Sequence, residues 1–213
     1  MGYVERIAEN PAWKIDMTFV GEAIFQTKSE NLPRIKQIIE TYSGKLQENR
    51  DMRKTAYLAL VRNLRDFPNP DYMRWHIAQI PKESDKYILS SMLDGIRDWP
   101  CLPSETDISP ILDCVKSDKW MIYQGAIMAL GICNTEIARE AVRPFLRLEP
   151  IRKNEPVYMY LCETLARIGT PEDVPLLKEI SLRSTNRNIK HGLIHTISEI
   201  ESRFQNNIPP FKL

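Results

Sequence analysis

The chain has 213 residues, of which 43% are hydrophobic and 27% are charged, and its formal net charge is +1 from 29 basic and 28 acidic side chains. Basic and acidic residues are nearly balanced on both sides of Asp118. Proteins that bind nucleic acid mainly through its phosphates carry a clear excess of basic residues, so nucleic acid is disfavoured as the main partner. The chain has 8 glycines and no sustained alternation of apolar and polar residues, so a sheet-rich fold is disfavoured as well.

The first half of the chain is predicted to form three helix pairs, which prolines and polar residues separate. The first pair is degenerate, as we expect for the terminal unit of a stacked array, one face of which must meet water. The predicted helices cover residues 17–27 and 33–42, 50–65 and 71–79, and 86–98 and 107–116.

The second half carries clearer helix signals. A break at Asn134 and Thr135 offers an N-cap for a helix that we expect to continue to Leu148. Gly169 suits the left-handed position at a helix C-terminus, and Thr170 suits the N-cap of the helix that follows. The predicted helices cover residues 118–133, 135–148, 157–168, 171–180 and 186–204, followed by an extended or disordered tail over 205–213.

The most informative feature is a repeat with a period of 32–35 residues. Each apolar anchor of the repeat occupies a matching position in its helix, and prolines recur between the anchors. A period in this range is typical of stacked helix pairs, none of which can bury its apolar face alone. The anchors are Leu64, Ile96, Leu130, Leu165 and Ile197, and the prolines are Pro33, Pro110, Pro144 and Pro175, with Pro70 as a looser member.

Residues 165–177 (LARIGTPEDVPLL) and 126–131 (AIMALG) resemble the junctions of HEAT-like helical repeats. The resemblance extends over about residues 50–203. It implies an all-α fold, a right-handed α-α superhelix of about five to six HEAT-like helix pairs. We expect a single domain over residues 1–204, in which 1–48 form a degenerate N-terminal cap and 49–204 form regular repeats.

Arginines form the first candidate binding surface. Three of them recur every fourth residue along one predicted helix, and two more follow at the end of the next unit. Guanidinium groups suit the bidentate capture of carboxylates or phosphates. The alternative is that Glu136 and Glu140 pair with the stripe as ordinary helix-surface salt bridges. The candidate partner-binding arginines are Arg139, Arg143, Arg147, Arg183 and Arg187.

Trp75 is the sixth candidate partner-binding residue. It lies with Tyr72 and His76 on a short predicted helix, and tryptophan is a residue type enriched at the energetic centre of protein interfaces. An aromatic side chain at helical spacing can equally belong to a core, so this remains a hypothesis about an interface.

His191, His195 and Glu199 form a weak candidate metal site. Their spacing of four residues places them on one face of the last predicted helix, where two imidazoles and a carboxylate could share a metal ion. One helix seldom supplies a complete site and no other cluster joins it, so a solvated polar face is the competing interpretation. We therefore expect no metal and no other cofactor.

Enzyme signatures are missing from the sequence: it has no P-loop, dinucleotide-binding, nucleophile-elbow or zinc-protease motif. The chain also resembles, in size and repeat type, DNA glycosylases that remove alkylated bases. Those enzymes place an acidic residue one turn after a tryptophan. Here the four tryptophans are followed at that spacing by Met17, Gln79, Pro103 and Gln124, none of which is acidic.

The sequence therefore favours a non-catalytic protein-binding module that uses its concave face, as an adaptor or an intracellular inhibitor. A toxin immunity protein is one version of the inhibitor, and a DNA-binding protein or alkylation-repair glycosylase is the alternative from another class. We expect a protein partner, no membrane partner and a cytoplasmic location, because the sequence shows neither a signal peptide nor a span of about 20 apolar residues.

Overall fold

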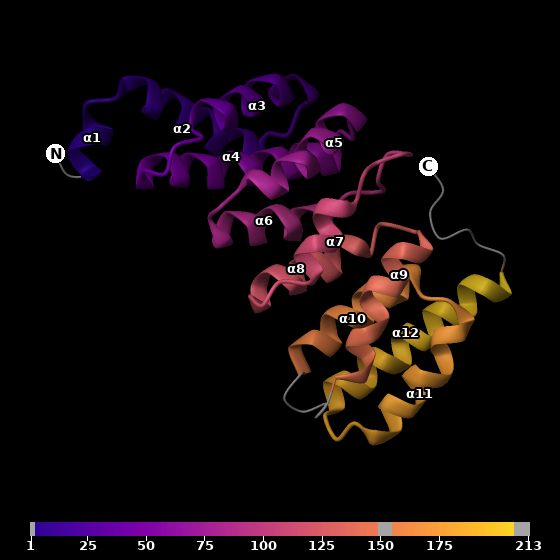
Figure 1. Cartoon of the computed structure of the whole chain (residues 1–213). Coiled ribbons are helices and arrows are strands. Elements are labelled where there is room, and N and C mark those ends of the chain that lie inside the picture. The colour runs from indigo at the N-terminus through magenta and orange to yellow at the C-terminus, as the bar shows by residue number, and fades with distance from the viewer. Residues whose placement is uncertain (1–2, 149–154, 207–213) are drawn as a thin grey trace. The chain divides into compact units, whose positions relative to one another are not determined.

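The computed structural model describes residues 3–148 and 155–206, and within these ranges all regular structure is helical (Figure 1). This confirms the predicted all-α class. The helices group into two compact units that divide between Asp107 and Ile108. One continuous repeat domain over residues 1–204 stays a prediction.

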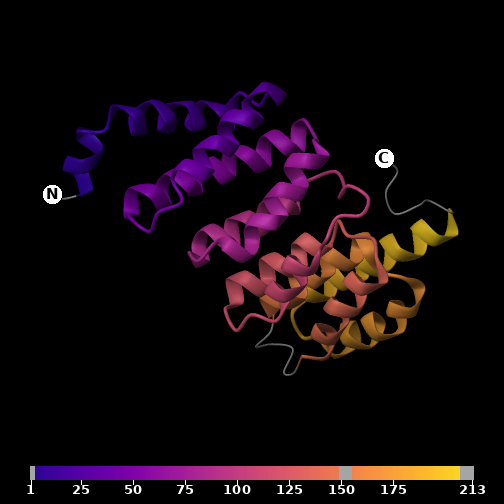
Figure 2. The same cartoon turned by 45° about the horizontal axis from the view of Figure 1, so that its top comes forward.

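In the first unit, α2, α4 and α6 pack one against the next, and α3 packs on α4 (Figure 2). Helix α2 begins at Pro11 rather than Met17, because the Asn10 side chain accepts a hydrogen bond from the Trp13 amide and Pro11 suits the first turn. The elements are α1 (Tyr3–Ala8), α2 (Pro11–Phe25), η1 (Ser29–Asn31), α3 (Leu32–Thr41), α4 (Gln47–Asp66), α5 (Pro70–Gln79), η2 (Ile80–Lys82) and α6 (Lys86–Ile96).

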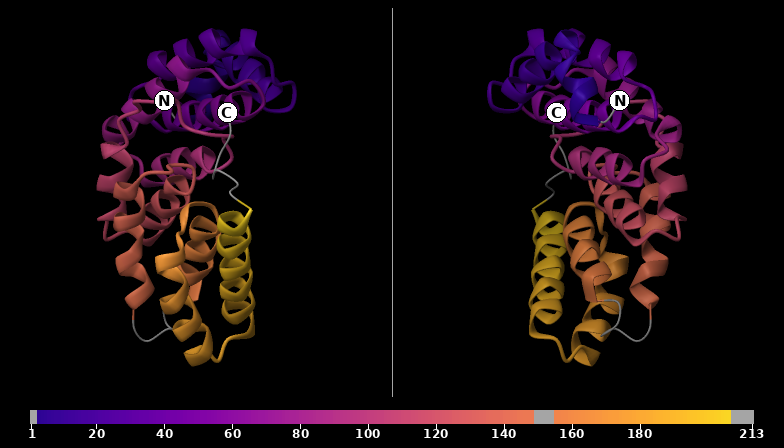
Figure 3. Two further views of the ribbon diagram at one scale, coloured as in Figure 1. Left: turned by 90° about the vertical axis from the view of Figure 1, so that its right-hand side faces the viewer. Right: turned by 90° about the vertical axis from the view of Figure 1, so that its left-hand side faces the viewer.

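In the second unit, α10 packs between α8 and α12, and α11 lies beside α12 (Figure 3). Helix α12 continues to Gln205, and most of the predicted tail lies outside the described residues. The elements are α7 (Ser109–Val115), α8 (Trp120–Leu130), α9 (Glu136–Val142), η3 (Arg143–Arg147), α10 (Glu155–Ile168), η5 (Pro171–Asp173), α11 (Val174–Arg183) and α12 (Arg187–Gln205).

The predicted helix from Thr135 to Leu148 is wrong in its second half. Its start is confirmed, because the Thr135 hydroxyl accepts a hydrogen bond from the Ala138 amide at 3.2 Å. Helix α9 then ends at Val142, and Arg143–Arg147 form a 3-10 helix with Pro144 in its first turn. Proline cannot donate the next helical hydrogen bond, so the α-helical hydrogen-bond pattern stops there.

The predicted left-handed role of Gly169 is also wrong, because no glycine in the described part of the chain has a positive φ. A Cβ added at Gly169 would lie 2.7 Å from Cδ1 of Ile200 and 2.5 Å from the Leu165 carbonyl oxygen. The missing side chain is therefore what lets α12 approach the end of α10.

The five anchors of the repeat are all buried, with exposed fractions of 0% for the first four and 8% for the last. They lie on α4, α6, α8, α10 and α12 in chain order, and we call these five the layer helices. The apolar frame read from the sequence is thereby confirmed as part of the core.

The residue just before each anchor carries a second pattern, which the sequence analysis missed. Asn63 donates from its amide to the Ala23 carbonyl of α2, Thr164 donates to Ile127 of α8, and Thr196 donates to Cys162 of α10, at 2.8, 2.9 and 3.0 Å. The two remaining positions hold small residues, Gly95 and Ala129. At Asn63, Thr164 and Thr196 the side chain bonds to a backbone carbonyl of the preceding helix, and at Gly95 the missing side chain leaves room for Val61 of α4.

Replacing Gly95 by alanine is expected to lower the free energy of unfolding by about 1–3 kcal/mol, because a Cβ there would lie 2.6–2.7 Å from three side-chain atoms of Val61. Gly21 in α2 is the matched control. A Cβ there meets nothing within 4 Å, so Gly21→Ala is expected to stabilise by about 0.5–1 kcal/mol. Urea unfolding of both variants checks this, and equal effects would contradict the close approach of α6 to α4.

A buried aromatic cluster joins α4, α5 and the segment that follows α6. His76 is fully buried, with its ring edge-on to Tyr57 and Trp99 at centroid distances of 5.5 and 5.3 Å. Its Nε2 lies 3.2 Å from the Met92 carbonyl oxygen and donates to it, while Nδ1 has no partner in the described residues. Burial lowers the pKa of His76 to about 4, so the imidazole is neutral in the folded protein.

This histidine predicts a loss of stability in mild acid. Its pKa is about 4 folded and about 6.5 unfolded, so the unfolded chain binds the extra proton as the pH falls. The contribution is complete above about pH 7.5, and about 2 kcal/mol is lost as the pH falls from 7.5 to 5. Denaturant unfolding across that range should show a smaller pH slope for His76→Phe. An unchanged slope would contradict a neutral buried imidazole.

Candidate functional site

The predicted arginine stripe does not form one free surface. Arg143 donates from Nε to Asp173 at 2.7 Å, from Nη1 to Glu136 at 2.6 Å and from Nη2 to Thr170 at 3.2 Å. Asp173 is 5% exposed, so the guanidinium neutralises a buried carboxylate and joins η3 to η5. These hydrogen bonds raise the pKa of Arg143, with the Asp173 bond as the largest cause. Arg143 therefore has a structural role, in which it links η3 to η5.

The other predicted arginines divide between paired and exposed positions. Arg139 donates to Glu136 at 2.8 Å and to Asn134 at 3.0 Å, and Arg183 pairs with Glu179 at 3.3 Å. Arg147 is exposed beside a hollow of about 480 Å³ that Arg143 also lines. Arg187 is exposed at the start of α12. The expected salt-bridge alternative with Glu136 thus holds for Arg139 and Arg143, and the stripe is broken where η3 begins.

The candidate metal residues lie on the exposed face of a layer helix, six and two residues before its anchor and two residues after it. We call these positions the exposed register. His191, His195 and Glu199 are all exposed on α12, and His195 Nδ1 lies 3.7 Å from a Glu199 carboxylate oxygen. Counted from the anchors, the equivalent residues of α10 are Met159, Glu163 and Arg167. Among the described residues no group of three or more histidine, cysteine or acidic side chains is placed to hold a metal ion.

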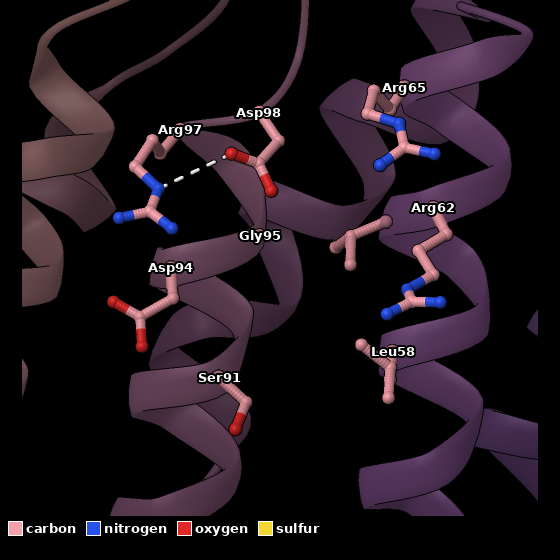
Figure 4. Close-up of a pocket in the computed structure, with 9 residues that line it drawn as sticks. Leu58, Arg62, Arg65, Ser91, Asp94, Gly95, Arg97 and Asp98 are labelled. Carbon is pink, nitrogen blue, oxygen red and sulfur yellow. Dashed lines mark hydrogen bonds and ion pairs between the residues drawn. The ribbon is translucent and has the colours of Figure 1, made fainter. Parts of the chain in front are cut away.

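The same register on α4 and α6 lines a groove of about 250 Å³ in the first unit (Figure 4). The side chains of Leu58 and Arg62 extend from α4 toward α6, and Gly95 keeps the two helices close (Figure 4). We call this the α4–α6 groove. Its charged and polar lining comprises Arg62, Arg65, Ser91, Asp94, Arg97 and Asp98.

The charges of the α4–α6 groove are only partly paired within the protein. Arg65 donates two hydrogen bonds to Asp66 at 2.8 and 3.2 Å, and Arg97 donates one to Asp98 at 3.3 Å. Arg62 makes one long hydrogen bond, 3.4 Å, from Nη1 to the Ile24 carbonyl. The groove therefore holds a guanidinium that can take a better acceptor than the one it has.

Asp94 is the matching anion of the groove. Its side chain is open to solvent on one side, and across the described residues it has no hydrogen bond or ion pair. Neighbouring atoms desolvate the carboxyl and raise its pKa, an effect that the charge of Arg97 opposes. Because the groove offers both an underused cation and an underused anion, it suits a charged protein surface better than a row of phosphates.

Trp75 lies where the sequence analysis placed it, on α5 and half-buried, with Lys36 Nζ 5.5 Å from its ring centroid. It lines a second hollow of the first unit together with Tyr57 and Arg53. The α4–α6 groove residues were missed because they come from two repeats about 32 residues apart. The signal that could have found them is the exposed register of the layer helices.

Every helix in the described part of the chain is too short or too polar to traverse a bilayer. Comparisons with protein-family models, with curated proteins and with solved structures find no match for this chain.

Proposed function

We propose that this chain is a non-catalytic protein-binding module, built as a right-handed superhelix of HEAT-like helix pairs, that binds a partner protein in the cytoplasm. The observation that carries the proposal is the α4–α6 groove, where Arg62 and Asp94 stand with incomplete partners beside the exposed apolar side chain of Leu58. An apolar centre between charged groups is a composition that protein interfaces use.

The position of the groove on the layer helices supports this role. Within each unit the layer helices pack closely against one another, whereas the contacts of α7 with α9 and of α11 with η3 are less extensive. In a curved array the helices with the closest neighbours form the inner layer, so we assign the concave face to the layer helices. The binding face of this proposal is therefore the α4–α6 groove, and the arginine stripe on α9 and η3 does not contribute to it.

The direct test is affinity capture from lysate of the source organism with the tagged wild-type chain, Arg62→Glu and Lys54→Glu. Lys54 is the matched control, because it is an exposed cation on the same helix but lies outside the groove. We expect a stoichiometric protein on the wild type and on Lys54→Glu, and its loss on Arg62→Glu. A captured protein that is retained by Arg62→Glu would contradict the assignment of the groove.

Nuclease and salt arms separate the alternative classes. A protein band that survives nuclease at moderate salt supports the binding module, whether the module is an adaptor or an inhibitor such as a toxin immunity protein. Capture of nucleic acid alone, lost at moderate salt, would instead support a DNA-binding or alkylation-repair role. A captured toxin whose activity is abolished in the complex would identify the inhibitor version.

A further inference from the structure

A second hollow of the first unit, of about 520 Å³, lies among α3, α4, α5 and the segment after η2. We call it the Trp75 pocket. Its apolar wall is the half-buried indole of Trp75 with the buried side chain of Ile39. Volumes of this size are typical of ligand pockets, and the part of the indole that lines the pocket offers an apolar contact surface for another aromatic group.

The pocket is lined by polar groups that the protein has buried. The side chains of Arg53 and Glu83 are 7% and 4% exposed, and they form a two-point ion pair at 2.9 and 3.2 Å. Arg53 also donates from Nη1 to the backbone carbonyls of Tyr42 and Gly44. These two charges cancel each other, so the lining is rigid and electrically neutral at this point.

Tyr57 is the polar group of the pocket that the protein leaves unused. The residue is 3% exposed and lines the hollow, yet within the described ranges its hydroxyl has no hydrogen-bond partner. Burial, reinforced by the charge of Glu83, raises the pKa of this phenol, so the hydroxyl keeps its proton. A protonated hydroxyl that lines the hollow beside an aromatic wall can donate to an acceptor that a ligand brings.

The unpaired charges at the rim are positive. Lys45 and Lys82 are exposed, line the pocket and have no ion-pair partner among the described residues, while Lys36 lies over the Trp75 ring. The remaining acid at the rim, Glu40, is 3.7 Å from the Lys36 ammonium. After these pairings, the charge left for a ligand comes from two lysines, which calls for an anionic group next to the apolar wall.

From this combination we infer that the Trp75 pocket receives an acidic peptide segment of the partner protein, with one aromatic side chain against Trp75 and carboxylates at Lys45 and Lys82. This inference rests on the proposed function, because it takes the partner to be a protein. It assigns a site separate from the α4–α6 groove, lined by none of the same residues.

The test is an NMR titration of the full chain, following the indole N–H signal of Trp75, assigned by its disappearance in Trp75→Leu. The probe is a capped pentapeptide with one phenylalanine between two pairs of glutamates. Its controls are the same peptide with lysines in place of the glutamates and with alanine in place of the phenylalanine. We expect the Trp75 signal to shift with the acidic aromatic peptide and at least tenfold weaker binding of both controls.

Protein variants locate the peptide. Lys45→Glu/Lys82→Glu changes only exposed side chains and is expected to weaken binding at least tenfold, while Lys54→Glu is expected to change it less than twofold. No shift at millimolar peptide, or equal binding by Lys45→Glu/Lys82→Glu, would overturn the inference. If the peptide fails to bind but the chain captures a protein that depends on Arg62, the inference is wrong and the proposed function stands. If the peptide binds but no protein is captured, the result counts against the proposed function alone.

Discussion

Replacing Arg53 by alanine is expected to lower the free energy of unfolding by about 3–5 kcal/mol, because it would leave the carboxylate of Glu83 buried without a counter-charge. The Glu83 side chain is 4% exposed. Arg53 donates one hydrogen bond to each of its oxygens, and the Asp85 amide donates a further one to Oε1 at 2.9 Å. The same truncation would remove a partner from the carbonyls of Tyr42 and Gly44. Urea unfolding of the two proteins measures the difference.

Two further variants separate charge burial from the loss of side-chain volume. Lys54→Ala, at the next and exposed position of α4, is expected to change stability by less than about 0.5 kcal/mol. The double variant Arg53→Met/Glu83→Leu, which removes both charges, is expected to recover much of the loss. A cost below about 1 kcal/mol for Arg53→Ala would show that Glu83 finds solvent or another partner.

Replacing Leu130 by alanine is expected to cost about 2–5 kcal/mol. Leu130 is the central anchor of the repeat, fully buried near the end of α8, so truncation removes apolar contacts and leaves a cavity. Ile194→Ala is the matched control in the same unit, because this side chain is 56% exposed on α12. Unfolding of Ile194→Ala should stay within about 0.5 kcal/mol of the wild type. Equal costs for both variants would contradict the register of the core.

The core of this protein could be predicted from its sequence because burial depends on a regular apolar pattern. The five anchors are buried, and they locate the five layer helices. The polar links before the anchors could have been found by the same alignment, since Asn63, Thr164 and Thr196 hold one register and Gly95 and Ala129 share it. A polar residue next to a buried anchor signals a bond to a neighbouring backbone.

The predicted helix that carries the arginine stripe is wrong from Arg143 onward. The prediction assumed an α-helix through Arg147, although Pro144 stands inside the segment. In the 3-10 helix that forms instead, a spacing of four residues turns the side chain by about 120° from its starting face. The partner of Arg143, Asp173, lies 30 residues away in sequence, and no local pattern specifies such a pair.

The candidate sites were predictable in part. Trp75 was selected for its residue type and does line a pocket. The polar groups around Trp75 could not be predicted, because Arg53 and Glu83 are 30 residues apart and pair only when α4 meets the segment after η2. The α4–α6 groove escaped notice for a similar reason. Its arginines and aspartates look like ordinary helix-surface charges until two helices bring them together.

The most direct test of the binding-module account is amide hydrogen exchange of the chain alone and in complex with the partner that it captures. Binding at the α4–α6 groove predicts slower exchange over residues 58–65 and 91–98, with little change over 136–147. Slower exchange confined to 136–147, or no change in the first unit, would contradict the assignment of the binding face.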